Sequence, residues 1–237
     1  DGTTTVDSSN ISSTFTGLAG SETLTLSGSG SVASKNVASG QSVTLGSIAI
    51  ANGTGVASNY SLTSATLDIT RRPISLSGTR VYNATTTASS SELTTLSNLV
   101  GSETLALSNS GTISNANVGT DKTVTIGSLS LGNGSNGGLG SNYTLSGGTH
   151  TLSVTKRPVT ISGTRVYDGT ATVSNSSINT LNNRAGSETL SLTGSGSIGS
   201  AAVGTGKAIT LGTLALADNS GLASNYSLSS GTFDVTV

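Results

Sequence analysis

A long internal repeat constrains this chain more than any other feature. The pentapeptide Gly-Ser-Glu-Thr-Leu begins at residues 20, 101 and 186, at intervals of 81 and 85 residues. A second marker, Ser-Asn-Tyr followed by Ser or Thr and then Leu, begins at residues 58, 141 and 224, at intervals of 83 and 83. A period of this length is typical of a small domain, because solenoid coils repeat every ~20 to 50 residues. The sequence therefore predicts three tandem domains, over residues 1–71, 72–156 and 157–237.

Composition limits the core that each domain can build. The 237 residues include 5 Tyr, 2 Phe and no Trp, Met or Cys, so Leu, Ile and Val must supply most of the buried side chains. Only 9% of the residues are charged and the formal net charge is -1, whereas a nucleic-acid site needs clustered basic residues. No apolar run approaches the ~18 residues of a membrane span. We expect neither nucleic-acid binding nor membrane insertion by this segment.

Apolar and small polar residues alternate along most of the chain, which is typical of strands with one buried face. In each domain the alternation slips by one residue at a glycine, at Gly46, Gly127 and Gly212. A slip turns later side chains to the opposite face unless the backbone bulges or bends. We interpret the slip as a glycine bulge or a corner where the chain changes sheets, and two strands joined by a very tight turn are the alternative.

About seven short strands per domain favour an all-β fold of three small Ig-like β-sandwiches in an elongated rod. Pro73 and Pro158 mark the first strand of the second and third domains, almost without a linker. The alternative is a β-grasp-like unit with one short helix, which residues 88–100 would form in the middle domain. The first domain lacks its first strand in this alignment, because Asp1 aligns with Asn83 and Asp168. We expect the resulting sheet edge to be exposed or filled by a neighbouring molecule.

Few residues are suited to catalysis or metal binding. His150 is the only histidine, and the other domains have no titratable counterpart, so we predict neither a catalytic triad nor a zinc site. Two Gly-x-Gly-x-x-Gly matches precede no amphipathic helix, and the Asp residues are too scattered for a calcium loop. We therefore predict no enzyme activity and no cofactor.

Several residues recur as structural markers of the repeat. The acidic markers are Glu22, Glu103 and Glu188, and the aromatic markers are Tyr60, Tyr143, Tyr226, Tyr82 and Tyr167. Arg80 and Arg165 recur before Val-Tyr, and we expect the recurrent Glu and Arg to form ion pairs or to fix turns. The Asn that precedes Tyr in the second marker is expected to cap a turn.

The segment from Lys156 to Thr170, Lys-Arg-Pro-Val-Thr-Ile-Ser-Gly-Thr-Arg-Val-Tyr-Asp-Gly-Thr, resembles the signature of the YDG repeat and the related MBG repeats. The resemblance covers the whole chain, through the turn at residues 202–207 and the late Asn-Tyr marker. The middle domain departs from it with Tyr82-Asn83-Ala84. Such repeats occur in tandem in large bacterial surface adhesins, including filamentous-haemagglutinin-like exoproteins of two-partner secretion. The resemblance implies an extracellular, cell-surface or secreted stalk and brings no catalytic residues.

Together these features predict a structural spacer that contacts its neighbouring repeats and acts in cell-cell or cell-surface adhesion and biofilm formation, with self-association as a further expectation. The alternative is a carbohydrate-binding or surface-binding module, including an ice-binding one, repeated for valency. Sugar sites usually need aromatic platforms, and about two tyrosines per domain give few.

Overall fold

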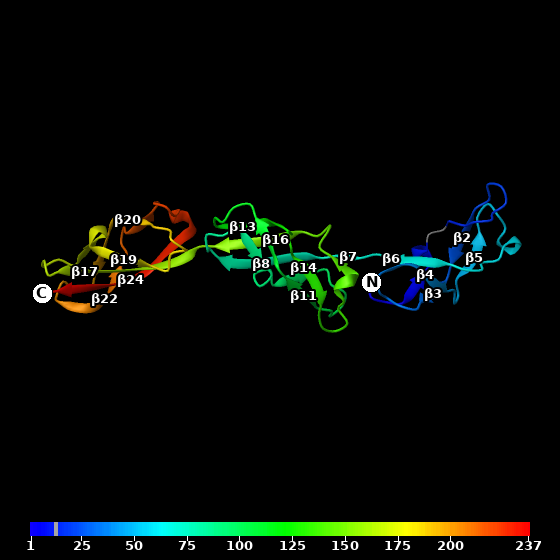
Figure 1. Ribbon diagram of the computed structural model, residues 1–237, viewed down its shortest axis with the longest axis horizontal. Coiled ribbons are helices and arrows are strands. Elements are labelled where there is room, and N and C mark those ends of the chain that lie inside the picture. Colours follow the sequence, from blue (N-terminus) through cyan, green and yellow to red (C-terminus); the bar gives the residue numbers. More distant parts are fainter. Residues whose placement is uncertain (12–13) are drawn as a thin grey trace. The chain divides into compact units, whose positions relative to one another are not determined.

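The computed structural model describes residues 1–11 and 14–237, which form strands and short 3-10 helices but no α-helix. One strand pattern recurs three times along the chain (Figure 1). The predicted all-β class with three tandem repeats is confirmed. The short helix of the β-grasp alternative is absent, because residues 88–100 contain the end of β9, a turn and β10.

The first repeat has six strands in two sheets among its described residues. The strands are β1 (Thr5–Asp7), β2 (Leu24–Ser27), β3 (Ser29–Val32), β4 (Ala38–Thr44), β5 (Ala49–Asn52) and β6 (Thr66–Ile69), and the 3-10 helices are η1 (Ser8–Asn10) and η2 (Ala57–Asn59). One sheet has the order β1-β3-β4-β6, and β2 pairs with β5 in the other. Strand β6 is therefore an edge.

The middle repeat contains ten strands, several of them very short. They are β7 (Arg72–Pro73), β8 (Ser75–Val81), β9 (Thr87–Ser89), β10 (Thr95–Ser97), β11 (Leu105–Ser108), β12 (Ser110–Ile113), β13 (Gly119–Thr125), β14 (Ser130–Asn133), β15 (Tyr143–Thr144) and β16 (His150–Thr155), with η3 (Gly140–Asn142). Neighbouring strands follow the order β8-β16-β13-β12-β9, and β11 pairs with β14 and β7 with β15.

The third repeat contains eight strands. Its strands are β17 (Arg157–Val166), β18 (Thr172–Ser174), β19 (Ile178–Asn182), β20 (Ser191–Thr193), β21 (Ser195–Ile198), β22 (Gly204–Thr210), β23 (Ala215–Ala217) and β24 (Tyr226–Thr236), with η4 (Asn175–Ser177) and η5 (Ala223–Asn225). The larger sheet has the order β18-β21-β22-β24-β17-β19, and β20 pairs with β23.

In the middle and third repeats the first and last strands of the larger sheet pair in parallel, which the residue pattern did not predict. In the third repeat β17 runs parallel to β24, and in the middle repeat β8 runs parallel to β16. The last strand in turn pairs antiparallel with the strand before it in the sheet, as β24 does with β22. Each of these mixed sheets therefore places its first and last strands side by side.

The three marker glycines lie in tight turns at which the chain changes sheets. Gly46 and Gly212 have φ of +57° and +56°, and they separate β4 from β5 and β22 from β23. The turn is closed in the first repeat by Ile48 N–H, which donates to Leu45 O at 2.7 Å. A Cβ on Gly46 would lie 2.7 Å from Ser29 O, so only glycine fits this left-handed position closely against the neighbouring strand.

A small apolar core lies within the first repeat and another within the third. In the third repeat Ile161, Val173, Ile198, Ile209, Leu214, Phe233 and Val235 form one buried cluster. The first repeat buries a smaller set, Val6, Ile11, Val32, Val43 and Ile48. The strands gather into two compact units, and the boundary between the units runs through the middle repeat. One unit comprises Asp1–Ser75, Leu96–Ser108 and Ser130–Gly148, and the other Leu76–Thr95, Asn109–Leu129 and Thr149–Val237.

Candidate functional site

The two recurrent markers meet in space within every repeat. Their tyrosine donates a hydrogen bond to their glutamate: Tyr60 to Glu22 at 2.5 Å, Tyr143 to Glu103 at 2.6 Å, and Tyr226 to Glu188. The same phenolic oxygen accepts a backbone N–H from Ala19, Val100 or Ala185 at 3.0 to 3.1 Å. A charge-assisted bond of this kind is stronger than a neutral one, so it fixes the loop of the first marker to the end of the second.

The expected pairing of recurrent Glu with recurrent Arg is wrong. Arg165 instead donates to the carbonyl oxygens of Thr170 and Thr172, and it forms an ion pair with Asp168 at 3.2 Å. Its guanidinium also lies 5.7 Å from the centre of the Phe233 ring, within cation–π range. The arginine therefore fixes a turn, the second of the two expected roles, and it fixes that turn in its own repeat.

Asp168 of the Tyr-Asp-Gly signature is part of that turn. Its Oδ1 accepts from Thr170 N at 2.9 Å and from Thr170 Oγ1 at 3.0 Å. These bonds lower the pKa of the Asp168 carboxyl, the Thr170 backbone N–H first. Asn83 makes the same two bonds to Thr85 in the middle repeat, which shows that the position needs a hydrogen-bond acceptor rather than a charge.

The junction between the middle and third repeats uses the second oxygen of the marker glutamate. The Tyr82 hydroxyl donates to Glu188 Oε1 at 2.6 Å, while Tyr226 donates to Glu188 Oε2. The rings of Tyr82 and Tyr226 meet edge to face, with centroids 5.4 Å apart. Arg157 adds a bond from Nη1 to Tyr82 O at 3.3 Å. One carboxylate therefore joins two tyrosines that belong to successive repeats.

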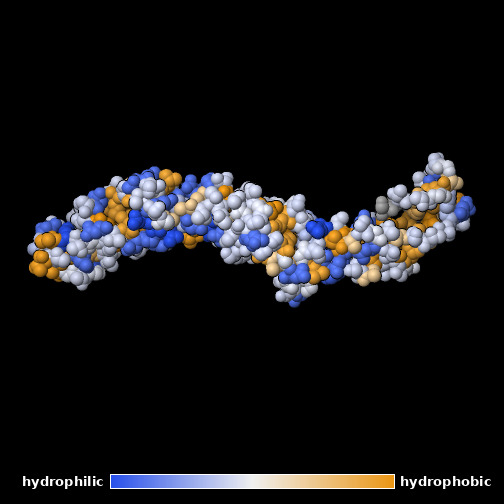
Figure 2. All heavy atoms as spheres, in the orientation of Figure 1, coloured by the Kyte–Doolittle hydropathy of each residue, from blue (hydrophilic) through white to orange (hydrophobic). Residues whose placement is uncertain are grey.

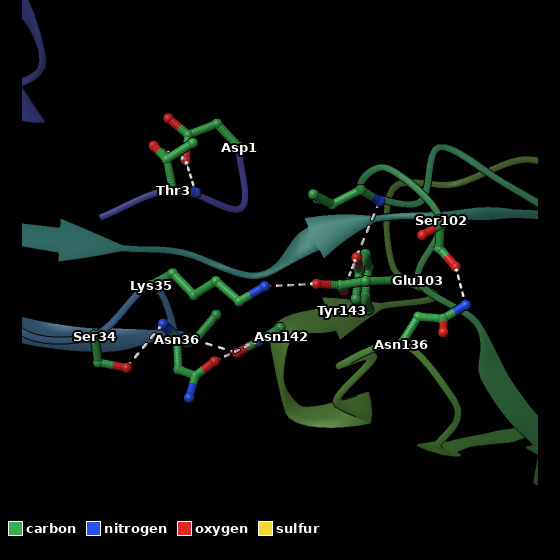
Figure 3. A network of polar contacts seen from close by, with 12 residues as sticks. Asp1, Thr3, Ser34, Lys35, Asn36, Ser102, Glu103, Asn136, Asn142 and Tyr143 are labelled. Atoms are coloured by element: carbon green, nitrogen blue, oxygen red, sulfur yellow. Dashed lines mark hydrogen bonds and ion pairs between the residues drawn. The ribbon is translucent and has the colours of Figure 1, made fainter. Parts of the chain in front are cut away.

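The junction between the first and middle repeats has the same plan with a different donor. Lys35 Nζ of the first repeat donates to Glu103 Oε1 at 2.9 Å, and the Tyr143 hydroxyl donates to Glu103 Oε2 (Figure 3). The Tyr143 and Lys35 bonds, in that order, lower the pKa of the Glu103 carboxyl. At this junction an ammonium group donates to the second oxygen of the glutamate.

An asparagine clamp accompanies the glutamate at both junctions. Asn142 Oδ1 accepts from Val37 N at 3.0 Å, and Asn142 Nδ2 donates to Asn36 Oδ1 at 2.9 Å (Figure 3). At the other junction Asn225 Oδ1 accepts from Val118 N at 2.9 Å, and its Nδ2 donates to Asn117 Oδ1 at 2.9 Å. The side chains expected to cap a turn therefore reach into the preceding repeat instead.

Burial at the junctions shifts the tyrosine pKa values upward. The pKa of Tyr82 rises to about 12, chiefly because burial disfavours the phenolate and then because of its bond to Glu188. Burial is also the largest cause of the raised pKa of Tyr143 and of Tyr226, followed by their bonds to glutamate. These hydroxyls therefore remain hydrogen-bond donors well into alkaline solution.

The other predicted markers lie apart from the junction contacts or at the start of strands. Pro73 ends the two-residue strand β7, and Pro158 is the second residue of β17. The side chain of Tyr167, which is equivalent to Tyr82, is 54% exposed. His150 is buried in β16. Outside residues 12 and 13, no three His, Cys, Asp or Glu side chains gather as a metal site would require.

Sequence reasoning missed half of each junction. Lys35, Asn36 and Asn117 were not singled out, although the dipeptide Asn-Val recurs at residues 36–37 and 117–118 and could have revealed the clamp.

No helix among the described residues has the length and apolar character that crossing a membrane would need.

Comparison with known proteins agrees with the repeat structure. The model of the YDG domain matches residues 1–67, 70–152 and 151–233, which together make up most of the chain. No curated protein and no solved structure matches the chain. The threefold strand pattern, the turn at the Tyr-Asp-Gly signature and these three matches lead to one conclusion: the chain belongs to the YDG domain family and contains that domain three times.

Proposed function

We propose that this chain is a non-enzymatic structural spacer of an exported bacterial adhesin, in which polar junctions hold each YDG repeat against the next. The observation that carries the proposal is the asparagine clamp, which makes the same pair of hydrogen bonds at both junctions. A contact that recurs with the same atoms is a property of the repeat. A spacer needs such a contact because it must transmit position and force from one domain to the next.

The chemistry of the clamp suits this role. Asn225 is 1% exposed, and a buried amide that lost its partners would be left unsatisfied, at a cost of about 1 to 3 kcal/mol. Its oxygen and nitrogen bond two adjacent residues, Val118 and Asn117, which restricts rotation about the junction. The glutamate adds a second, charge-assisted attachment nearby. Two attachment points resist bending better than one.

The location and the adhesin context are supported by the resemblance of the signature to repeats of large surface adhesins. The absence of Cys and the low charge agree with an exported repeat protein. Cell adhesion and biofilm formation would then depend on other parts of such an adhesin, with this segment setting their distance from the cell.

Hydrogen exchange on the three-repeat chain tests the junction. In the wild type, the Val37 and Val118 amides should exchange slowly because Asn142 and Asn225 accept from them. Asn142→Ala should speed exchange at Val37 alone, and Asn225→Ala at Val118 alone. Asn59→Ala is the matched control, since Asn59 occupies the same motif but is exposed. Unchanged exchange in both clamp variants would contradict a role for the clamp.

A glycan array with the same chain tests the spacer role against a binding role. We expect no saturable binding to any glycan. Specific binding that survives Asn142→Ala and Asn225→Ala would contradict the spacer proposal, because it would place the function outside the junctions.

A further inference from the structure

The first and last strands of the third repeat form the longest ladder in that repeat. Strand β17 pairs with β24 in parallel at 10 positions, from Arg157 opposite Tyr226 to Val166 opposite Thr236 (Figure 1). In the sheet β24 has β22 on its other side, and β17 has β19. Neither strand is therefore an edge, and each is held by two neighbours.

Further hydrogen bonds join the two strands near both ends of this ladder. Just past the last pair, Tyr167 N–H donates to Thr236 O at 2.9 Å, and the Thr236 hydroxyl donates to Arg165 O at 3.3 Å. Near the other end, the Ser229 hydroxyl donates to Val159 O at 3.1 Å. Side chains and backbone therefore both contribute to the attachment of β24 to β17.

The apolar face of the pair is buried. Val159 and Ile161 of β17 are at most 1% exposed. Phe233 and Val235 of β24 are buried to the same degree and share the core of the third repeat with Ile161. Figure 2 shows mostly hydrophilic or neutral residues on the visible side of this repeat, at the left of the view, with small hydrophobic patches. Burial keeps water from competing for the hydrogen bonds of the ladder, which makes opening any one of them costly.

Tension along the chain acts on this pair in shear. The chain enters β17 at Arg157 and leaves β24 after Thr236, and in a parallel pair these two points lie at opposite ends of the ladder. Pulling them apart slides one strand along the other. Because the bonds of a parallel ladder run across the strands at even spacing, all of them carry the load together. Residues 167–225 carry load only after the pair has separated.

The middle repeat has a shorter form of the same ladder. Strand β8 pairs with β16 in parallel at 6 positions, and β7 pairs with β15 in parallel at 2. Between β15 and β16 the chain turns at Gly147, whose φ is +81°, and Gly148 N–H donates to Leu145 O at 3.3 Å. Past the last pair, Tyr82 N–H donates to Thr155 O at 2.9 Å. The middle repeat therefore has 6 consecutive pairs where the third repeat has 10.

We propose that the parallel pair of first and last strands is the load-bearing element of the middle and third repeats, which keeps each of them folded under tension along the chain. The third repeat, with the longer ladder, is the stronger of the two. This function goes beyond the spacer role, which rests on contacts between repeats. Asn142 and Asn225 of the junctions lie in η3 and η5, outside the four paired strands. Failure of the hydrogen-exchange test on the junctions would therefore leave load-bearing by the strands intact, and the reverse also holds.

Single-molecule pulling on the whole three-repeat chain tests the proposal. The sequence contains no Cys, so two introduced cysteines give unique attachment points for the handles. Lys156→Cys with Val237→Cys places the handles at opposite ends of the β17 and β24 pair and loads it in shear. Tyr167→Cys with Val237→Cys places both handles at the same end and peels the strands apart. All three positions are exposed, so neither combination opens the core.

Shear should require at least about twice the unfolding force of peeling at the same pulling speed, because forced unfolding is governed by the barrier that the load must lower. The two chains should have the same midpoint in denaturant, so that only the direction of the load differs between them. Equal forces in the two directions would overturn the proposal, since the core and not the strand pair would then set the resistance.

Two further comparisons test the ladder itself. Arg71→Cys with Lys156→Cys loads the middle repeat, which should unfold at a lower force than the third; an equal or higher force would overturn the role of ladder length. In the chain with handles at residues 156 and 237, Tyr167→Pro removes the donor to Thr236 O and should lower the unfolding force. Tyr167→Ala keeps that N–H and should unfold as the parent chain does. Equal losses in the proline and alanine variants would overturn the role of the backbone bond.

Discussion

Tyr82 and Glu188 lie in successive repeats and are joined by a hydrogen bond of 2.6 Å from the phenolic hydroxyl to Oε1. Glu188 is therefore shared between the third repeat, which uses its other oxygen through Tyr226, and the middle repeat. The shared carboxylate brings together a glutamate and two tyrosines that are far apart in sequence. It also identifies the residues at which a junction can be weakened without opening a core.

Removal of the Tyr82 hydroxyl should destabilise the junction. In Tyr82→Phe the ring contact with Tyr226 remains, but Glu188 Oε1 loses its donor, so the free energy of unfolding should fall by about 1 to 3 kcal/mol. Denaturant unfolding of the three-repeat chain measures this change. Tyr167→Phe is the control, because the equivalent Tyr167 is 54% exposed and should leave stability unaltered. Equal losses in the two variants would contradict a specific junction bond.

Alkaline pH should weaken the same junction. The pKa of Tyr82 is about 12 in the folded chain against 10.0 for the ordinary group. The bond's stabilisation is complete below pH 10, where the unfolded chain keeps its proton, and is lost as the pH rises toward 12. Ultraviolet titration of tyrosinate should show one tyrosine ionising near pH 12 that disappears in Tyr82→Phe. An unchanged titration curve in the variant would rule out this assignment.

Acid should weaken the other junction. The pKa of Glu103 is lowered from 4.5 by its bonds to Tyr143 and Lys35, so the stabilisation is present above pH 4.5 and is lost as the pH falls through the lowered value. Unfolding measured from neutral pH to about pH 3 should show this loss, and Glu103→Gln should flatten the dependence. Lys35→Met should reduce the slope less, because the Tyr143 bond is the larger cause. A full acid dependence in Glu103→Gln would assign the effect to other carboxyls.

Restoring the glycine of the Tyr-Asp-Gly signature should stabilise the middle repeat. Ala84 has φ of +62° where Gly169 of the third repeat has +78°, and an L-residue in this region is strained by roughly 1 kcal/mol. Ala84→Gly should therefore raise the stability of the middle repeat by about 0.5 to 1 kcal/mol. Thermal unfolding checks the gain. Gly169→Ala is the reciprocal variant and should lose a similar amount; a loss in Ala84→Gly would show that backbone strain does not decide this turn.

Local pattern predicted much of this protein. Alternation identified strands, the slips at Gly46, Gly127 and Gly212 located the corners, and the repeat spacing predicted three tandem domains. Each of these features depends on residues that are neighbours in the chain. The Glu and Tyr markers were also visible, because recurrence alone singles them out.

The partners of those markers were decided by tertiary structure. The Asn142 clamp spans 105 residues to Val37 and the Asn225 clamp spans 107 residues to Val118, and no local periodicity encodes contacts of that separation. The parallel pairing of β17 with β24 likewise joins opposite ends of a repeat. The amino-acid sequence by itself determined an all-β chain of three like domains. Only the tertiary structure decided that the Glu188 carboxylate and the Asn142 and Asn225 amides connect successive domains, because these contacts depend on which strand ends lie side by side.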